Sequence, residues 1–197
     1  MTIPVQKGGF WVLDFDIENR PASYWVPDRP TAEITAICAA WADFPSEQFV
    51  WLLGPAETDA EHLAMMREML LGFKELYDAA DMVTGHYITR HDLPIINGAL
   101  MDYGLPVLGQ KMVQDTKTQM VRKADIPATQ EYLATMEKIV ARKVHMTQHD
   151  WRQANRLTIE GRTATEKRVR GDVRQHLRLR KAMIRDGLLH TPTIWRP

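Results

Sequence analysis

Acidic residues stand at three places in this chain where neither secondary-structure propensity nor an apolar core asks for a carboxylate. Asp16 and Glu18 lie two residues apart on an apolar, aromatic-rich segment. Asp92 follows a short apolar run, and Asp172 lies in the last long amphipathic segment. Carboxylate oxygens are ligands that Mg²⁺ prefers, and two such ions roughly 3.5 to 4 Å apart can hold the attacking and leaving oxygens of a displacement at phosphorus. Asp92, directly before a Leu-Pro pair, also fits a helix N-cap.

The order and spacing of these acids resemble those of the DEDD superfamily of 3'-to-5' exonucleases and, within it, the proofreading domains of family B DNA polymerases. The Asp-X-Glu of the first family motif is matched by FDIEN at 15–19. The Gly-aromatic-Asn-Ile-X-X-Phe-Asp-Leu-Pro run of the second is matched by GHYITRHDLPIIN at 85–97. The third, an acid four residues after a Tyr or five after a His, is approached by RVRGDVRQH at 168–176. Asp115 in VQDTK resembles the strand-end Asp-Thr of many members, and the resemblance covers residues 10 to about 185.

This resemblance implies an RNase H-like fold and a site that binds two Mg²⁺ or Mn²⁺ ions. Asp16 would bridge both ions, and Glu18 and Asp172 would bind the ion that carries the nucleophilic water. Asp92 would complete the site, partly through water. Because four close carboxylates repel one another, the site is expected to depend on metal.

Four residues depart from the family pattern. Tyr87 stands where the second motif has Asn, and His91 where it has Phe. Arg168 and Lys167 stand where the third motif has its Tyr or His. Since Arg stays charged, it cannot act as the general base, whose contribution is typically about 10²- to 10⁴-fold. Arg168 can instead hold a phosphate oxygen, and His91, His176 and Tyr87 are the substitute bases that the sequence offers.

Three further residues, Asp14, Tyr24 and Trp25, bear on the candidate site. Asp14 and Asp16 also form an Asp-X-acid pair, but the apolar run directly before Asp16 favours Asp16 and Glu18 as the first motif. Tyr24 and Trp25, in the loop that follows this motif, are candidates to stack on a terminal base of the substrate.

Hydrophobic periodicity predicts the elements that position these residues. Residues 10–17 alternate as in a strand buried mainly on one face, which places the three acids Asp14, Asp16 and Glu18 on one side. Strands expected at 33–41 and 48–53 complete an antiparallel meander with this strand. Two later strands are expected at 82–86 and 106–116.

Helices are expected between and after these strands. The first has Thr58 or Asp59 as its N-cap, and the helical ranges are 58–80, 93–103, interrupted pieces from 116 onward, and 161–186. The expected fold class is therefore α/β, an RNase H-like fold with a mixed sheet of about five strands flanked by helices. Residues 1–197 are expected to form a single domain with a basic C-terminal helix.

Charge is segregated along the chain. Residues 1–140 carry 11 Lys and Arg against 20 Asp and Glu, whereas residues 141–197 carry 14 against 5. The basic segment indicates either a nucleic-acid partner, held by salt-sensitive contacts with phosphates, or a solvated helix face. On a regular helix its stripe of cations points away from Asp172; the stripe consists of Arg170, Arg174, Arg178, Lys181 and Arg185.

Composition excludes several other classes. The longest apolar run, 34–42, has nine residues against the roughly 20 that a membrane span needs, and the N-terminus lacks the apolar core of a signal peptide. A cytoplasmic location and no membrane partner are expected. The single Cys38 is expected to be a buried thiol. His145 and His149 offer little for zinc, because no Glu follows His145 as in a protease motif.

These observations predict a metal-dependent 3'-5' exonuclease that removes nucleoside monophosphates from single-stranded DNA ends. It would be a free-standing phage or bacterial enzyme, or act with replication or repair proteins. Two alternatives remain open. One is a ribonuclease of the same fold, since the motifs do not distinguish RNA from DNA. The other is a weakly active or inactive nucleic-acid-binding module, because the third-motif base is absent.

Overall fold

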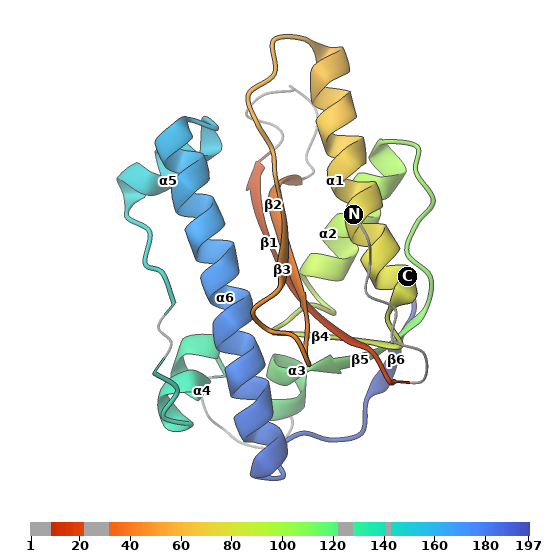
Figure 1. The fold of residues 1–197 in the computed structure, drawn as a ribbon, viewed down its shortest axis with the longest axis vertical. Coiled ribbons are helices and arrows are strands. Elements are labelled where there is room, and N and C mark those ends of the chain that lie inside the picture. Colours follow the sequence, from red (N-terminus) through yellow and green to blue (C-terminus); the bar gives the residue numbers. More distant parts are fainter. Residues whose placement is uncertain (1–8, 22–31, 122–127, 141–142) are drawn as a thin grey trace.

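A mixed six-stranded sheet with the order β3-β2-β1-β4-β5-β6 forms the centre of the chain (Figure 1). The computed structural model describes residues 9–21, 32–121, 128–140 and 143–197. The strands are β1 (Val12–Pro21), β2 (Ala32–Trp41), β3 (Gln48–Leu52), β4 (Met82–Gly85), β5 (Lys111–Asp115) and β6 (Thr193–Trp195).

The first three strands form the antiparallel meander that the sequence predicts. β4 joins the other side of β1 in parallel, and β5 joins β4 in parallel. Parallel neighbours need long connections, which the helices supply. The sixth strand was not predicted: β6 pairs antiparallel with β5, and its three largely exposed residues are too few to show a period of two.

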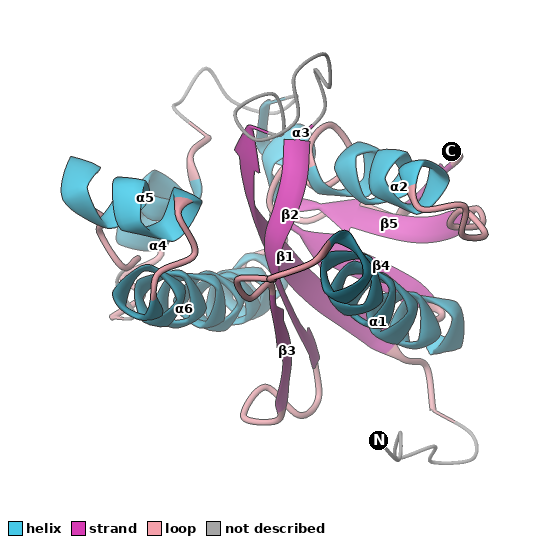
Figure 2. Cartoon of the chain, turned by 90° about the horizontal axis from the view of Figure 1, so that it is seen from above, coloured by secondary structure: helices cyan, strands magenta, loops and turns pink. Residues whose placement is uncertain are grey.

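Helices cover both faces of the sheet (Figure 2). The long helix α6, with α4 and α5 beside it, lies on one face, and α1 and α2 lie on the other. The bounds are α1 (Asp59–Ala79), α2 (Asp92–Asp102), α3 (Thr116–Val121), α4 (Gln130–Met136), α5 (Gln148–Asn155) and α6 (Ile159–Arg185). Thr58 is the N-cap of α1, as predicted, because its side chain accepts a hydrogen bond from the Glu61 backbone N–H. None of the described helices combines the length and the apolar character that crossing a membrane requires.

Small side chains on β2 determine how closely α6 approaches the sheet. Ala36, Cys38 and Ala40 are completely buried, and they pack beneath the apolar stripe of α6, which consists of Val169, Val173 and Leu177. Cys38 is thus the buried thiol that the sequence predicts, and burial raises its pKa. Because β1 is the neighbour of β2, the same close packing brings α6 against β1.

β1 alternates as predicted. Leu13, Phe15 and Ile17 enter the larger core beneath α1, where the Phe15 and Phe73 ring centroids lie 4.9 Å apart. Since successive strand residues point to opposite faces, the acids of β1 face α6.

Candidate metal centre

Charged side chains of β1 and α6 face one another in matched order. Three alternate residues of β1 lie against three residues of α6 that are four positions apart. The β1 residues run from Glu18 back to Asp14, and the α6 residues run from Arg168 to His176. The pairs are Glu18 with Arg168, Asp16 with Asp172, and Asp14 with His176. Alternate strand residues are about 6.6 Å apart, and helix residues four positions apart are about 6 Å apart. Because these spacings are similar, β1 and α6 keep the same register over three side-chain contacts.

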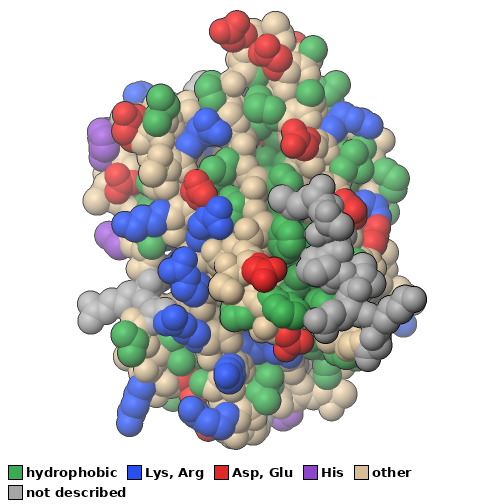
Figure 3. All heavy atoms as spheres, viewed as in Figure 1, with side chains coloured by type: hydrophobic (Ala, Val, Ile, Leu, Met, Phe, Trp, Pro, Cys, Tyr) green, Lys and Arg blue, Asp and Glu red, His purple; other side chains and the backbone are tan. Residues whose placement is uncertain are grey.

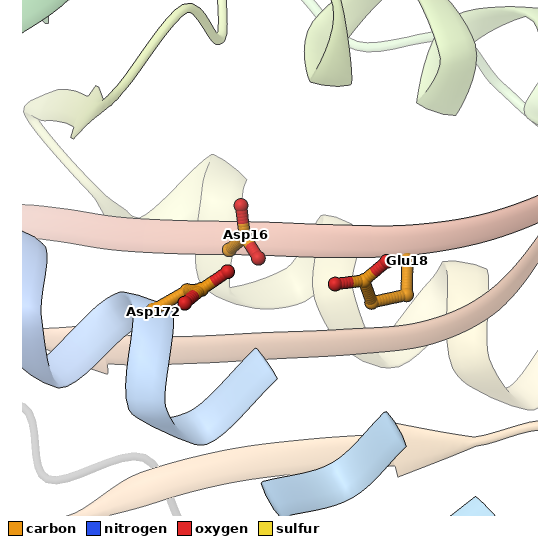
Figure 4. A group of neighbouring side chains, drawn as sticks. All are labelled: Asp16, Glu18 and Asp172. Atoms are coloured by element: carbon orange, nitrogen blue, oxygen red, sulfur yellow. The ribbon is translucent and has the colours of Figure 1, made fainter. Parts of the chain in front are cut away.

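Three carboxylates converge at the middle of this contact. Figure 4 shows Asp16 and Glu18 from β1 and Asp172 from α6 pointing toward one another. One oxygen of each lies within 4.8 Å of the others. Opposite ligand oxygens around Mg²⁺ are about 4.2 Å apart, because each is about 2.1 Å from the ion. This group of three acids could hold a metal ion.

Asp172 offers an oxygen that suits such an ion. Its Oδ1 is buried and has no hydrogen-bond partner among the described residues. Burying a carboxylate oxygen without a partner is costly, and a cation removes that penalty. The donor set, all carboxylate oxygen, is the one that hard cations such as Mg²⁺ and Mn²⁺ prefer.

Asp92 reaches the same strand from the opposite side. Its Oδ1 accepts a hydrogen bond of 3.2 Å from the Ile17 backbone N–H, between Asp16 and Glu18. The alternative role of Asp92 as an N-cap is wrong: α2 begins at Asp92, and the N-cap is His91, without any side-chain cap. Asp92 is not one of the three clustered acids, but it lines the same cleft of about 250 Å³.

Two cations contact the acid group. Lys143 places its Nζ 2.7 Å from Asp172 Oδ2. Arg168 donates from Nε to Glu18 Oε1, and its Nη2 lies 3.9 Å from Asp172 Oδ2. Sequence reasoning missed Lys143, because it precedes α5 in an irregular segment where no periodicity assigns it to a face. Its place in the basic C-terminal segment was the only available signal.

The pKa values of all three clustered carboxylates are raised. Burial, and then repulsion from Asp92, Asp172 and Glu18, raises the pKa of Asp16 well above its ordinary value. Burial also raises the pKa of Glu18 and of Asp172, although Arg168 and Lys143 act in the opposite direction. The two cations therefore compensate only part of the negative charge.

Arg168 remains charged in this position. Burial alone would lower its pKa, but Glu18 and Asp172 raise it. Its Nη1 also donates to the Val144 carbonyl at 2.9 Å, and its guanidinium lies 5.1 Å from the Trp151 ring centroid. The position where the family has its base thus holds a fixed cation.

Asp14 does not join the acid group. It is fully buried, and its Oδ1 lies 2.9 Å from His176 Nδ1. His176 is also buried, with Nε2 at 3.0 Å from Thr116 Oγ1. Both ring nitrogens of His176 are therefore occupied, and this candidate base does not line the cleft.

The loop before α2 is held by Asp115. Its carboxylate accepts hydrogen bonds from the Tyr87 and Thr89 backbone N–H groups, each at 3.0 Å. Tyr87 adopts a φ of 74°, a conformation that Asn tolerates better than Tyr. The Lys117 Nζ lies 3.8 Å from the Tyr87 ring centroid. Asp115 thus has a structural role that fixes the mouth of the cleft.

His91 lies at the same mouth, half exposed. Its Nδ1 is 3.5 Å from Asp92 Oδ2, and the interaction with Asp92 raises its pKa. Tyr24 and Trp25, the predicted stacking residues, lie outside the described residues.

Comparisons with known proteins establish the fold. No protein-family model matches the chain, and no curated protein matches it. Among solved structures, the chain is similar to the family B DNA polymerase of the hyperthermophilic archaeon Pyrobaculum calidifontis, with a TM-score of 0.68 and 17% sequence identity. The match covers 89% of this chain and 25% of the polymerase. The predicted α/β fold, an RNase H-like mixed sheet flanked by helices, is confirmed, with one strand more than expected.

We expect Asp16→Asn to raise the thermal unfolding midpoint at neutral pH in EDTA. Because the pKa of Asp16 is raised in the folded chain above 3.8, the wild type loses stability as the pH rises from 3.8 through that raised pKa. The difference in unfolding midpoint between Asp16→Asn and the wild type should therefore vanish as the pH falls below 3.8, where the wild-type carboxyl becomes neutral like the amide. Thermal unfolding across pH measures it.

Glu75→Gln, on the exposed surface of α1, is the matched control and should gain nothing. With Mg²⁺ the wild type should have the higher unfolding midpoint, because the ion binds to the folded state and stabilises the wild type more than Asp16→Asn. A loss of stability in Asp16→Asn at neutral pH in EDTA would contradict this account.

Proposed function

We propose that this chain is a DEDD-type, metal-dependent nuclease that removes nucleotides from the 3' end of single-stranded DNA. The observation that carries the proposal is the convergence of Asp16, Glu18 and Asp172, with Asp92 across the strand. These acids occupy the motif positions of the family that the sequence resembles. Residues 1–197 would form one nuclease unit.

Each acid has a task that its position supports. Asp16, between Asp92 and Asp172, would bind both of two Mg²⁺ or Mn²⁺ ions. Glu18 and Asp172 would hold one of these ions, Asp172 through its unpaired Oδ1. When bound, the ions supply the Lewis acidity that activates water and neutralises charge at phosphorus.

Lys143 and Arg168 would hold the site together in the absence of metal. Lys143 pairs with Asp172, and Arg168 lies against both Glu18 and Asp172, so each offsets repulsion that a divalent ion would otherwise offset. Once metal is bound, the same cations are close enough to donate hydrogen bonds to a phosphate oxygen.

The size and lining of the cleft support a strand end as the substrate. A volume of about 250 Å³ lies just below the range of pockets that enclose drug-sized ligands, so it suits one terminal nucleotide. Tyr87 and His91 at its rim could contact that nucleotide, and Trp25, outside the described residues, remains the further stacking candidate from the sequence.

A second surface supports a nucleic-acid partner. Figure 3 shows Lys and Arg side chains gathered along α6. A groove of about 700 Å³ between α6 and the turn after β2 is lined by Arg174, Arg178, Arg180 and Lys181, with Asp43 as its one acid. Within the described ranges, Arg174, Arg178 and Lys181 form no ion pair. The groove lies on the flank of α6 away from Asp172, where it could hold phosphates farther along the strand.

One observation favours a second candidate, a binding module with little or no catalysis. Arg168 stands where the third motif has its base, so that position offers no proton acceptor, and its ion pair with Glu18 engages a candidate metal ligand. The two candidates differ in whether a metal can displace this contact.

We expect the wild type to shorten a 5'-labelled single-stranded DNA from its 3' end with Mg²⁺ or Mn²⁺, and not with EDTA. Asp172→Asn should lower this rate by about 10²-fold or more, because it removes a metal ligand while keeping the side-chain shape. Gel analysis of the ladder measures both, with Glu75→Gln as the unaffected control. An RNA strand of the same sequence decides between the DNA and RNA nucleases. Binding of either strand without cleavage would leave the binding module.

We expect the double variant Arg174→Gln/Arg178→Gln to bind single-stranded DNA more weakly and with a shallower salt dependence. Each lost phosphate contact should reduce the log–log slope by about 0.7. Fluorescence anisotropy over a salt series in EDTA measures it. Arg152→Gln/Arg156→Gln removes the same charge from exposed positions at α5 and serves as the control. Equal slopes for all three proteins would show that the groove does not contact the strand.

A further inference from the structure

A chain of hydrogen bonds connects the buried Asp14 with the rim of the cleft. Asp14 Oδ1 lies 2.9 Å from His176 Nδ1, and His176 Nε2 lies 3.0 Å from Thr116 Oγ1. Thr116 Oγ1 in turn lies 3.0 Å from His86 Nδ1. Asp14, His176 and Thr116 are buried, whereas His86 is half-buried and lines the cleft. None of these groups has a part in the metal centre described above.

The directions of these bonds follow from the available protons. An ionised Asp14 only accepts, so His176 carries a proton on Nδ1. If His176 is neutral, its Nε2 accepts the Thr116 hydroxyl proton. If His176 is charged, its Nε2 donates to Thr116, and the hydroxyl proton is directed at the Gly85 carbonyl, 3.3 Å away. In both of these arrangements the Thr116 hydroxyl proton is directed away from His86, so Thr116 Oγ1 accepts from His86 Nδ1 and His86 Nε2 keeps a free lone pair.

Strand register places His86 beside the metal centre. Asp14 on β1 pairs with Thr84 on β4 in parallel. Two residues beyond this pair come Asp16 in β1 and His86, which directly follows Gly85, the last residue of β4. Both line the cleft. Among the described residues, no hydrogen-bond partner occupies His86 Nε2.

The other candidate bases are engaged elsewhere. His176 has partners on both ring nitrogens, His91 is held by Asp92, and the Tyr87 ring lies under Lys117. Burial of His86, with a contribution from His176, lowers its pKa to about 3. The ring is therefore neutral at working pH, and its lone pair is available.

We propose that His86 is the proton acceptor that replaces the absent third-motif base, and that Asp14, His176 and Thr116 are positioning residues that fix its tautomer. This proposal rests on the proposed nuclease function. The attacking water loses one proton to His86 Nε2 as its oxygen bonds to phosphorus. The bond from phosphorus to the 3' oxygen breaks, and that oxygen takes a proton from solvent. His86 then releases its proton to solvent through the cleft.

The first test needs neither metal nor turnover. Histidine ¹⁵N NMR of the full chain in EDTA should show His86 at neutral pH with Nδ1 protonated and Nε2 unprotonated. Thr116→Val removes the hydroxyl and should abolish this fixed tautomer, whereas Thr116→Ser keeps the hydroxyl and should retain it. A protonated Nε2 in the wild type would overturn the tautomer argument.

The second test uses turnover. His86→Ala should lower kcat on single-stranded DNA by about 10²-fold, at the lower end of general-base effects because a ring of low pKa is a weak base. KM should stay within about threefold, since the metal ligands remain. Added imidazole should restore part of kcat to His86→Ala. The control, His149→Ala, removes an exposed imidazole from α5 and should change nothing.

The outcomes separate this proposal from the proposed function. Wild-type cleavage that persists in His86→Ala, or a His86→Ala defect that imidazole does not relieve, overturns the role of His86 and leaves the nuclease intact. If the wild type cleaves neither DNA nor RNA, the nuclease fails and the role of His86 fails with it, while the NMR result still reports whether the tautomer is fixed.

Discussion

Repulsion among carboxylates at the contact between β1 and α6 is the constraint around which this site is arranged. Asp16, Glu18 and Asp172 meet where two elements pack closely, and Asp92 adds a fourth negative group from the other side. Like charges at such distances are tolerated only if cations compensate them. Lys143 and Arg168 do so in part, while burial, and then repulsion from the neighbouring carboxylates, keeps the pKa of Asp16 raised. A metal ion, which this group of three acids could hold, would compensate the charge further.

The fold provides this convergence through simple packing. Small residues on β2 let α6 lie close to the sheet, and the similar spacing of alternate strand residues and of every fourth helix residue keeps three contacts in register. The same register that opposes Asp16 and Asp172 also opposes Asp14 and His176. The contact between β1 and α6 thus produces both the acid group and the start of the hydrogen-bond chain that ends at His86.

Much of this could be predicted from the sequence, because periodicity and motif spacing are local signals. The alternation of β1, the meander and the amphipathic helices follow from periodicity, and the resemblance of the motifs to those of DEDD exonucleases implied that Asp16, Glu18 and Asp172 share one site. Lys143 could not be predicted, because an irregular segment gives its side chain no defined direction. The chain from Asp14 to His86 joins four segments far apart in sequence, so only the tertiary structure reveals it. β6 was missed because three residues carry too little pattern.

The most direct measurement is anomalous diffraction from crystals of the full chain soaked in Mn²⁺. The account predicts Mn²⁺ bound between Asp16, Glu18 and Asp172, with Asp172 Oδ1 as a ligand and with Glu18 turned from Arg168 to the metal. Crystals saturated with Mn²⁺ in which the cleft holds no ion, while Lys143 and Arg168 remain on Asp172 and Glu18, would contradict it. The acid group would then be a structural charge network closed by its own two cations.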